Sequence, residues 1–150
     1  RSLSPLGICY DLASEQEANK SVKAGYYFTE IYTFEGFIIK EENKDLILDN
    51  WWLTPPFSKA SQFIDLLETY QDNLGKGFLL LNSNTETKYY QKALSLFPYV
   101  ILLNKRIPFI DPDKGQVSGN PMGQTIFYKG ERKHINNWKK YGTILQVDKE

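Results

Sequence analysis

The chain has 150 residues, of which 41% are hydrophobic and 15% aromatic, and its 18 basic and 18 acidic side chains cancel. This composition excludes a disordered chain, and no apolar run approaches the roughly 18 residues that a membrane-spanning helix needs. One cysteine and one histidine exclude an internal disulfide and argue against a structural metal site. We therefore expect a single domain, 1–150, in a reducing cytoplasm, with no metal and no membrane contact.

The first forty residues combine one clear strand pattern with segments of ambiguous period. The apolar run at 6–12 predicts a short buried strand that ends at Asp11. Residues 13–25 indicate a short helix or an irregular turn, closed at Gly25. Residues 26–39 are rich in aromatic and β-branched side chains, which favours extended structure although their period is unclear.

Strand and helix patterns then alternate as far as residue 104. Apolar runs predict three strands, 46–54, 77–83 and 99–104. Amphipathic patterns predict two helices, 58–73 and 85–97. The first helix would bury a stripe made of Phe63, Leu66, Leu67 and Tyr70. Ser58 and Thr85 are the expected caps, and Gly75 and Gly77 are expected to stop the first helix. Such alternation is typical of an α/β fold with a mostly parallel sheet and right-handed crossovers.

The carboxyl-terminal part of the sequence is basic. Residues 106–119 predict an extended segment with a turn at 113–115. A strand is expected at 123–130, and a last edge strand is expected at 142–147. The first 75 residues carry 6 basic and 12 acidic side chains, and the second 75 carry 12 and 6. Aromatic residues are interleaved with the lysines of the basic tail, 131–150. This pattern indicates either a nucleic-acid surface or a solvated face near a terminus.

The tetrapeptide Thr54-Pro55-Pro56-Phe57 follows a predicted strand, and in open α/β sheets ligands bind outside the carboxyl ends of the strands. Two consecutive prolines fix the direction of the Thr54 and Pro55 carbonyls, which can then hold an amine by hydrogen bonds. A ring at Phe57 can stack on a base that has been flipped out of a duplex. Taken alone, the four residues are also compatible with a plain loop and a core phenylalanine.

Four segments, in order and over roughly residues 8 to 130, resemble the phage-type DNA N6-adenine methyltransferases. The tetrapeptide resembles their (Asp/Asn/Ser)-Pro-Pro-(Tyr/Phe) signature. "YDLASEQEANKSVKAGYYFT" (10–29) is similar to their Asp-x-Ala-(Ala/Ser)-x-x-x-Asn-x-Lys segment with a following aromatic pair. "LLLNSNTETKYYQ" (79–91) is similar to an Asn-Thr-(Asp/Glu)-Thr-(Lys/Arg)-aromatic stretch. "NKRIPFIDPDKGQVSGNPMGQTIFY" (104–128) is similar to a Gly-Arg-Ile-x-Phe hairpin with a return strand.

The resemblance implies a Rossmann-like methyltransferase fold, mostly parallel with an antiparallel hairpin at the carboxyl-terminal end. It implies transfer of a methyl group from S-adenosylmethionine to the N6 amine of a flipped adenine in double-stranded DNA, without a metal. The implied catalytic residues are Thr54, Pro55, Pro56 and Phe57. The implied cofactor-binding residues are Asp11, Leu12, Ala13 and Ser14. When basic residues of the carboxyl-terminal part are added, the expected DNA-binding residues are Lys88, Arg106, Lys129, Arg132 and Lys133.

Two departures from the family pattern keep other functions open. Thr54 stands where the family usually has Asn or Asp, and a hydroxyl is a weaker acceptor. The segment with a Trp-x-Thr-Pro motif that usually precedes the first strand is missing. One alternative is therefore an inactive phage or mobile-element protein, of a bacterial host, that binds DNA or a host protein and interferes with restriction–modification. Another is methyl transfer to RNA, a free nucleotide or a protein amide.

Overall fold

The computed structural model describes residues 8–13, 24–29, 33–106, 110–111, 115–116 and 122–148. Its strands are β1 (Tyr10–Asp11), β2 (Tyr26–Tyr27), β3 (Trp51–Leu53), β4 (Gly77–Asn82), β5 (Tyr99–Leu103), β6 (Ile110–Asp111), β7 (Gly115–Gln116), β8 (Gln124–Lys129) and β9 (Gly142–Gln146). Its α-helices are α2 (Phe34–Ile38), α3 (Ala60–Thr69) and α4 (Lys88–Leu96). Its 3₁₀ helices are η1 (Glu41–Asn43), η2 (Phe57–Lys59), η3 (Gln71–Asn73) and η4 (Arg132–Lys140). No helix in these ranges is long and apolar enough to cross a membrane.

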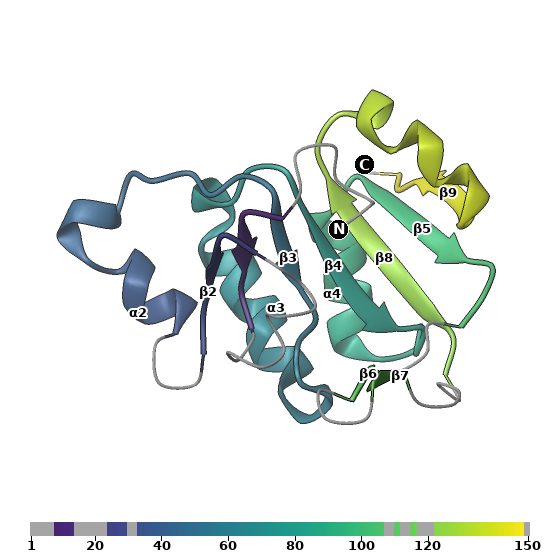
Figure 1. The fold of residues 1–150 in the computed structure, drawn as a ribbon, viewed down its shortest axis with the longest axis horizontal. Coiled ribbons are helices and arrows are strands. Elements are labelled where there is room, and N and C mark those ends of the chain that lie inside the picture. The colour runs from purple at the N-terminus through teal and green to yellow at the C-terminus, as the bar shows by residue number, and fades with distance from the viewer. Residues whose placement is uncertain are drawn as a thin grey trace.

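Seven strands form one mixed sheet in the order β2-β1-β3-β4-β8-β5-β9 (Figure 1). The neighbours from β2 to β4 are parallel. β8 is antiparallel to both β4 and β5, and β9 is antiparallel to β5. β6 and β7 form a separate antiparallel pair. The expected α/β sheet, parallel first and antiparallel at the carboxyl-terminal end, is confirmed. However, β8 enters between β4 and β5, so these two strands are not neighbours.

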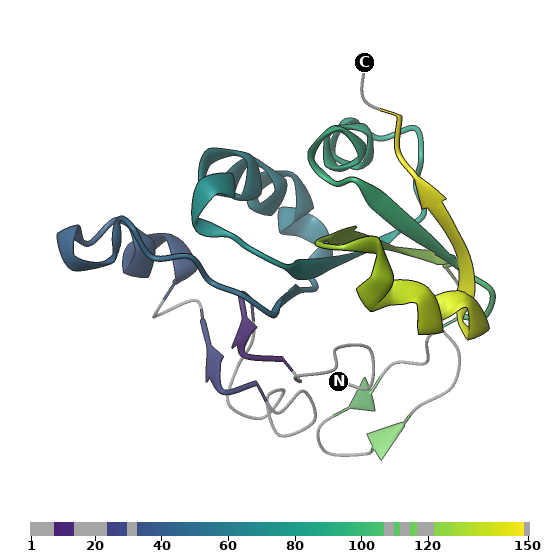
Figure 2. The same ribbon diagram turned by 90° about the horizontal axis from the view of Figure 1, so that it is seen from above.

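Each face of the sheet is covered by a different part of the chain. α3 and α4 lie on one face and η4 lies on the other (Figure 2). Because successive side chains of a strand point to opposite faces, β4 sends Leu79 and Leu81 into the core beneath α3 and α4. Phe78 and Leu80 belong to the second core, which contains Trp138 of η4. β4 is therefore apolar on both sides because both of its faces are buried.

The described residues of the basic segment, 131–148, are part of the fold. Ile135 and Trp138 of η4 are 0% and 1% exposed, and the Trp138 ring stacks on Phe78 with centroids 5.0 Å apart. A 3₁₀ helix has three residues per turn, so this spacing of three puts both side chains on its buried side. Its lysines Lys133, Lys139 and Lys140 are exposed. The interpretation of this segment as a solvated face is therefore right only for one side of η4, while β9 confirms the expected edge strand.

Two expected extended segments are shorter than their composition suggested. Among the described residues of 26–39, only β2 is a strand, and α2 begins at Phe34, where the Thr33 hydroxyl caps it by accepting the N–H of Gly36 at 2.9 Å. The strand expected at 46–54 begins only at Trp51. Asn50 has a φ of 57°, a left-handed conformation that a strand cannot include, and Leu48 makes only an isolated bridge to Leu74.

The two long helices exist where expected, but their ends differ. Ser58 lies within η2, and α3 begins without a side-chain cap. Thr87, and not Thr85, caps α4 by accepting the Tyr90 N–H. α3 ends at Thr69 and is followed by η3, so neither glycine stops it. The prediction of the buried stripe of α3 is partly right. Leu67 is buried, together with Ala60 and Ile64, which were not predicted. The other three expected residues are half-buried, namely Phe63, Leu66 and Tyr70.

Candidate active site

The carboxyl ends of the parallel strands meet at one edge of the sheet. β1 ends at Asp11, β3 ends at Leu53, and β4 ends at Asn82. β8 runs in the opposite direction, so its first residue, Gln124, lies at the same edge and pairs with Asn82. The tetrapeptide follows β3 directly. Four separate segments therefore bring polar groups to the edge where α/β sheets bind ligands.

A cavity of about 350 Å³ opens at this edge, and a volume of that order is enough for one small ligand. It is lined by Thr54, Pro55, Ala60, Leu80, Leu81, Asn82, Tyr89 and Gln124. Its walls are mainly apolar, with a few polar side chains placed on β4, β8 and the segment after β3. The structure thus brings the first half of the tetrapeptide into a cavity, as a ligand site requires.

Thr54 is exposed, and its hydroxyl is already engaged. The indole Nε1–H of Trp52 donates to Thr54 Oγ1 at 2.7 Å. The two side chains lie two residues apart, on the same face of an extended segment. A hydroxyl that accepts one hydrogen bond keeps its own O–H as a donor and has one acceptor position left. Thr54 is therefore better equipped to donate to a ligand than to accept from one.

The two prolines hold the chain between β3 and η2. Pro55 is buried and Pro56 is exposed, and the Pro56 carbonyl accepts the Lys59 N–H at 2.9 Å. Among the described residues, no N–H donates to the carbonyl of Thr54 or Pro55. These two carbonyls are held rigidly by the following rings and remain available to a ligand amine. Phe57 begins η2, and its side chain lies outside what the structure describes.

Of the expected cofactor-binding residues, Asp11 and Ala13 lie at the same edge as the tetrapeptide. Asp11 is 3% exposed, and its Oδ1 accepts the Ala13 N–H at 3.2 Å. The Leu12 N–H donates to the Trp52 carbonyl at 2.9 Å, and the Leu12 side chain is in the core. Leu12 can therefore meet a ligand only through its backbone. Ser14 lies outside the described residues.

Sequence patterns did not identify Asn82 and Gln124, which form a pair of amides across β4 and β8. The Nε2 of Gln124 donates to Asn82 Oδ1 at 3.2 Å. Gln124 Oε1 is buried and has no hydrogen-bond partner among the described residues. The only signal in the sequence is that each amide stands at the end of an apolar strand. The pairing of the two strands, which the sequence does not give, is what joins them.

A chain of three hydroxyls lies next to this amide pair. The Thr125 Oγ1 shares hydrogen bonds of 2.8 Å with Ser83 Oγ and with Tyr90 Oη. Thr125 is 0% and Tyr90 3% exposed. These bonds join β8 to the end of β4 and to α4. They fix the backbone on which Asn82 and Gln124 stand.

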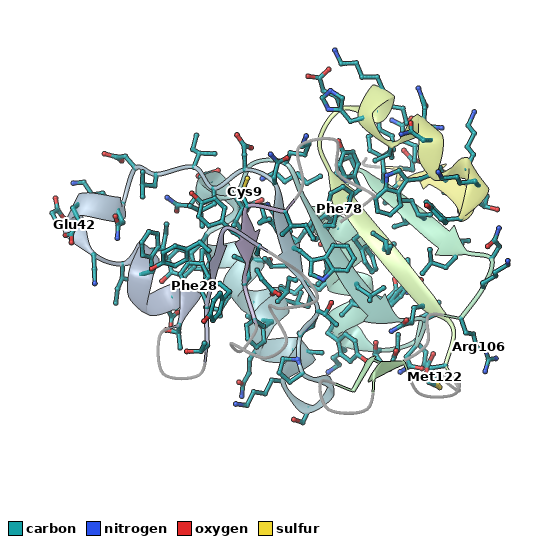
Figure 3. All side chains as sticks on the ribbon, viewed as in Figure 1. Cys9, Phe28, Glu42, Phe78, Arg106 and Met122 are labelled. Carbon is teal, nitrogen blue, oxygen red and sulfur yellow. The ribbon has the colours of Figure 1, made fainter. Side chains whose placement is uncertain are left out.

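The expected DNA-binding residues divide between the two edges of the sheet. Lys88 is exposed and begins α4 at the cavity edge, and Figure 3 shows Arg106 at that edge as well. Lys129 ends β8 at the opposite edge, where its Nζ donates to the carbonyls of Gln71 and Leu74 at 2.8 and 2.6 Å. Burial lowers the pKa of Lys129, and the negative charge of Asp72 offsets only part of this decrease.

Arg132 and Lys133 follow at that opposite edge. The Arg132 guanidinium donates to Asn136 Oδ1 at 2.7 Å, and the Lys133 ammonium lies 3.3 Å from a Glu131 carboxylate oxygen. The structure therefore does not gather the five basic residues around the cavity. In the part of the chain that is described, no group of three or more acidic, histidine or cysteine side chains could hold a metal ion.

The sequence matches a protein-family model over most of its length. The model of the family described as DNA N-6-adenine-methyltransferase (Dam) matches residues 10–149, which is nearly the whole chain. No curated protein and no solved structure matches it. The matched range includes the first strand, the tetrapeptide, both amides and all but the last residue of the basic segment.

Proposed function

Because the chain belongs to the DNA N-6-adenine-methyltransferase family, we propose that it transfers a methyl group from S-adenosylmethionine to the N6 amine of adenine in DNA. We further propose that its sheet is a methyltransferase variant of the Rossmann-like fold. Parallel strands from β2 to β4, helices on one face and an antiparallel β8 all support this assignment.

The observation that carries the proposal is the position of Thr54 and Pro55. They lie directly after a parallel strand, line a cavity sized for one small ligand, and hold two carbonyls without partners among the described residues. An adenine amine is a weak nucleophile because its lone pair is delocalised into the ring. Acceptors that take its N–H bonds favour the pyramidal form, in which the lone pair can attack. In the reaction the N6 nitrogen would form a bond to the methyl group as the S–CH3 bond of the sulfonium breaks, S-adenosylhomocysteine would leave as the thioether, and the amine would lose one proton to water.

The residues at the end of β1 fit the proposed cofactor. S-adenosylmethionine supplies an electrophilic methyl group on a sulfonium, and it also carries an ammonium. Asp11 provides a buried carboxylate, whose negative charge attracts either cation and whose oxygens can accept hydrogen bonds from the ammonium. We propose that S-adenosylmethionine is held by Asp11, by the backbone of Leu12 and Ala13, and by Ser14. The adjacent β3 then presents the tetrapeptide to the base, with the Phe57 ring stacked on it.

For the DNA backbone we propose contacts by Lys88 and Arg106, because both lie at the edge where the base would enter. Lysine and arginine side chains position DNA through its phosphates. Arg132 and Lys133 could contact only DNA that also reaches the opposite edge of the sheet. Lys129 would have to exchange its two backbone carbonyls for a phosphate, so we expect it to contribute least.

The test uses the full chain with radiolabelled S-adenosylmethionine and unmethylated DNA, followed by mass spectrometry of the nucleosides. We expect N6-methyladenine, and a loss of at least tenfold in rate for Thr54→Ala and for Phe57→Ala. Ser95→Ala, an exposed position on α4, is the control and should keep the rate. If both site variants retain the wild-type rate, the assignment of the tetrapeptide is wrong.

One observation favours a second function, that of an inactive methyltransferase-like protein that binds DNA or a host protein. The indole of Trp52 already donates to the hydroxyl oxygen of Thr54, the residue that stands where the family usually has Asn or Asp. Titration with S-adenosylhomocysteine in a calorimeter separates the two functions. Saturable binding together with N6-methyladenine supports the enzyme. A folded protein that forms no methylated base under any condition supports the binding function.

A further inference from the structure

We propose that Asn82 and Gln124 form a base-reading pair, in which the Gln124 Oε1 accepts an N–H of the target amine and the Asn82 Nδ2 donates to a ring nitrogen of the same base. This proposal rests on the proposed function, since it names the groups that recognise its substrate. Both residues line the cavity beside Thr54.

The hydrogen bond within the pair sets the direction of both amides. Gln124 Nε2 donates to Asn82 Oδ1 at 3.2 Å, so this hydrogen bond engages the nitrogen of Gln124 and the oxygen of Asn82. The remaining groups are the oxygen of Gln124 and the nitrogen of Asn82. The pair therefore offers one acceptor and one donor, on two neighbouring strands in direct register.

The unused oxygen of Gln124 is an unusual feature. It is buried and has no partner among the described residues, and a buried acceptor without a hydrogen bond costs roughly 1–3 kcal/mol. Because the Gln124 side chain lines the cavity, a small turn of this amide would bring the oxygen to a ligand N–H. The oxygen thus indicates that the ligand of this cavity carries a hydrogen-bond donor.

Adenine matches this pattern of groups. Its N6 amine is a donor that lies next to a ring-nitrogen acceptor on either side, and asparagine or glutamine reads the N6 and N7 groups through one donor and one acceptor. The arrangement also compensates for Thr54, whose hydroxyl oxygen already accepts from Trp52. In this chain the side-chain acceptor for the amine comes from β8, and Thr54 can donate its own hydrogen.

The experiment compares Gln124→Leu, which removes the acceptor, with Gln124→Glu, which keeps one. Gln146→Leu is the matched control, because Gln146 is an exposed strand glutamine on β9. Each full-length protein is titrated with 2′-deoxyadenosine and with the purine 2′-deoxyriboside that lacks the 6-amino group. Side-chain amide signals are followed by ¹⁵N NMR, and methyl transfer to DNA is measured in parallel.

We expect deoxyadenosine to shift the Gln124 and Asn82 amide signals in the wild type, and the analogue without the amine to leave the Gln124 signal unchanged. Gln124→Leu should lose this preference and about 100-fold in methyl-transfer rate, as for removal of one preorganised polar group. Gln124→Glu should keep most of the preference for deoxyadenosine, and Gln146→Leu should behave as wild type.

The two proposals fail in different ways. Equal binding of both nucleosides by the wild type, or an unchanged preference in Gln124→Leu, overturns the base-reading pair even if the protein is an active methyltransferase. An amine-dependent shift of the Gln124 signal in a wild type that forms no N6-methyladenine supports the pair and contradicts the proposed reaction.

Discussion

Replacing Trp138 by alanine tests whether the basic carboxyl-terminal segment is a structural part of the domain. Trp138 is 1% exposed, stacks on Phe78 at 5.0 Å with an interplanar angle of 16°, and meets Tyr141 edge-on at 6.3 Å. Ile135 is its buried neighbour on η4. Removing the indole would leave a large hole between η4 and the sheet.

The expected cost is large. A buried tryptophan replaced by alanine loses about 3–5 kcal/mol, from transfer of the ring to water and from the cavity left behind. Since domains of this kind are stable by about 5–15 kcal/mol, this is a major fraction of the total. With a urea dependence of about 2 kcal/mol per molar, the unfolding midpoint should fall by about 2 M. The midpoint is measured by far-ultraviolet circular dichroism, because the substitution removes a fluorophore.

Two variants of the same helix make the result specific. Lys139→Ala changes an exposed side chain of η4 and should stay within about 0.5 kcal/mol of wild type. Trp138→Phe keeps a ring and should lose less than Trp138→Ala. A midpoint for Trp138→Ala that equals that of Lys139→Ala would refute the placement of η4 on the sheet.

Three further predictions concern buried groups near the sheet. Thr125→Val keeps the shape but leaves the buried Tyr90 hydroxyl unpaired, so urea unfolding should show a loss of about 1–3 kcal/mol, and an unchanged midpoint would contradict the hydroxyl chain. Gly77→Ala should be destabilised by at least about 1–3 kcal/mol in thermal melts, because a Cβ there would collide with the Trp51 indole; a variant as stable as wild type would mean that this contact is absent. Burial, with the charge of a nearby carboxylate, raises the pKa of Tyr128 to about 12. The unfolded chain therefore loses this proton first as pH rises above about 10, and stability falls between about pH 10 and 12. At pH 11 this loss is about 1.4 kcal/mol, and Tyr128→Phe should remove it; equal alkaline slopes for the two proteins would contradict the shift.

The elements that could be predicted from the sequence are those whose residues repeat with a clear period. The apolar runs at 77–83 and 99–104 became β4 and β5, and the amphipathic pattern at 58–73 became α3 with short 3₁₀ turns at each end. The ends were less predictable. Thr85 and Thr87 are equally good caps by residue type, and only the path of the chain selects Thr87.

Features that depend on pairing between distant residues could not be predicted. Gly77 was expected to stop a helix, yet it pairs with Trp51 across β3 and β4 and leaves room for the indole. The tetrapeptide was found through local chemistry and a family signature. Asn82 and Gln124 carry no local signature, because only the insertion of β8 brings them together.

The insertion of β8 also governs the order in which the chain can fold. β4 needs a partner that lies 42 residues further along, at Gln124, and β5 has no sheet neighbour until β8 and β9 have been synthesised. Such non-local pairing is slow, and until it occurs β4 presents an open apolar edge that favours aggregation. We therefore expect fragments that end before residue 124 to aggregate. The wall of the cavity that Gln124 provides can form only once β8 has paired with β4, so ligand affinity would report on this pairing.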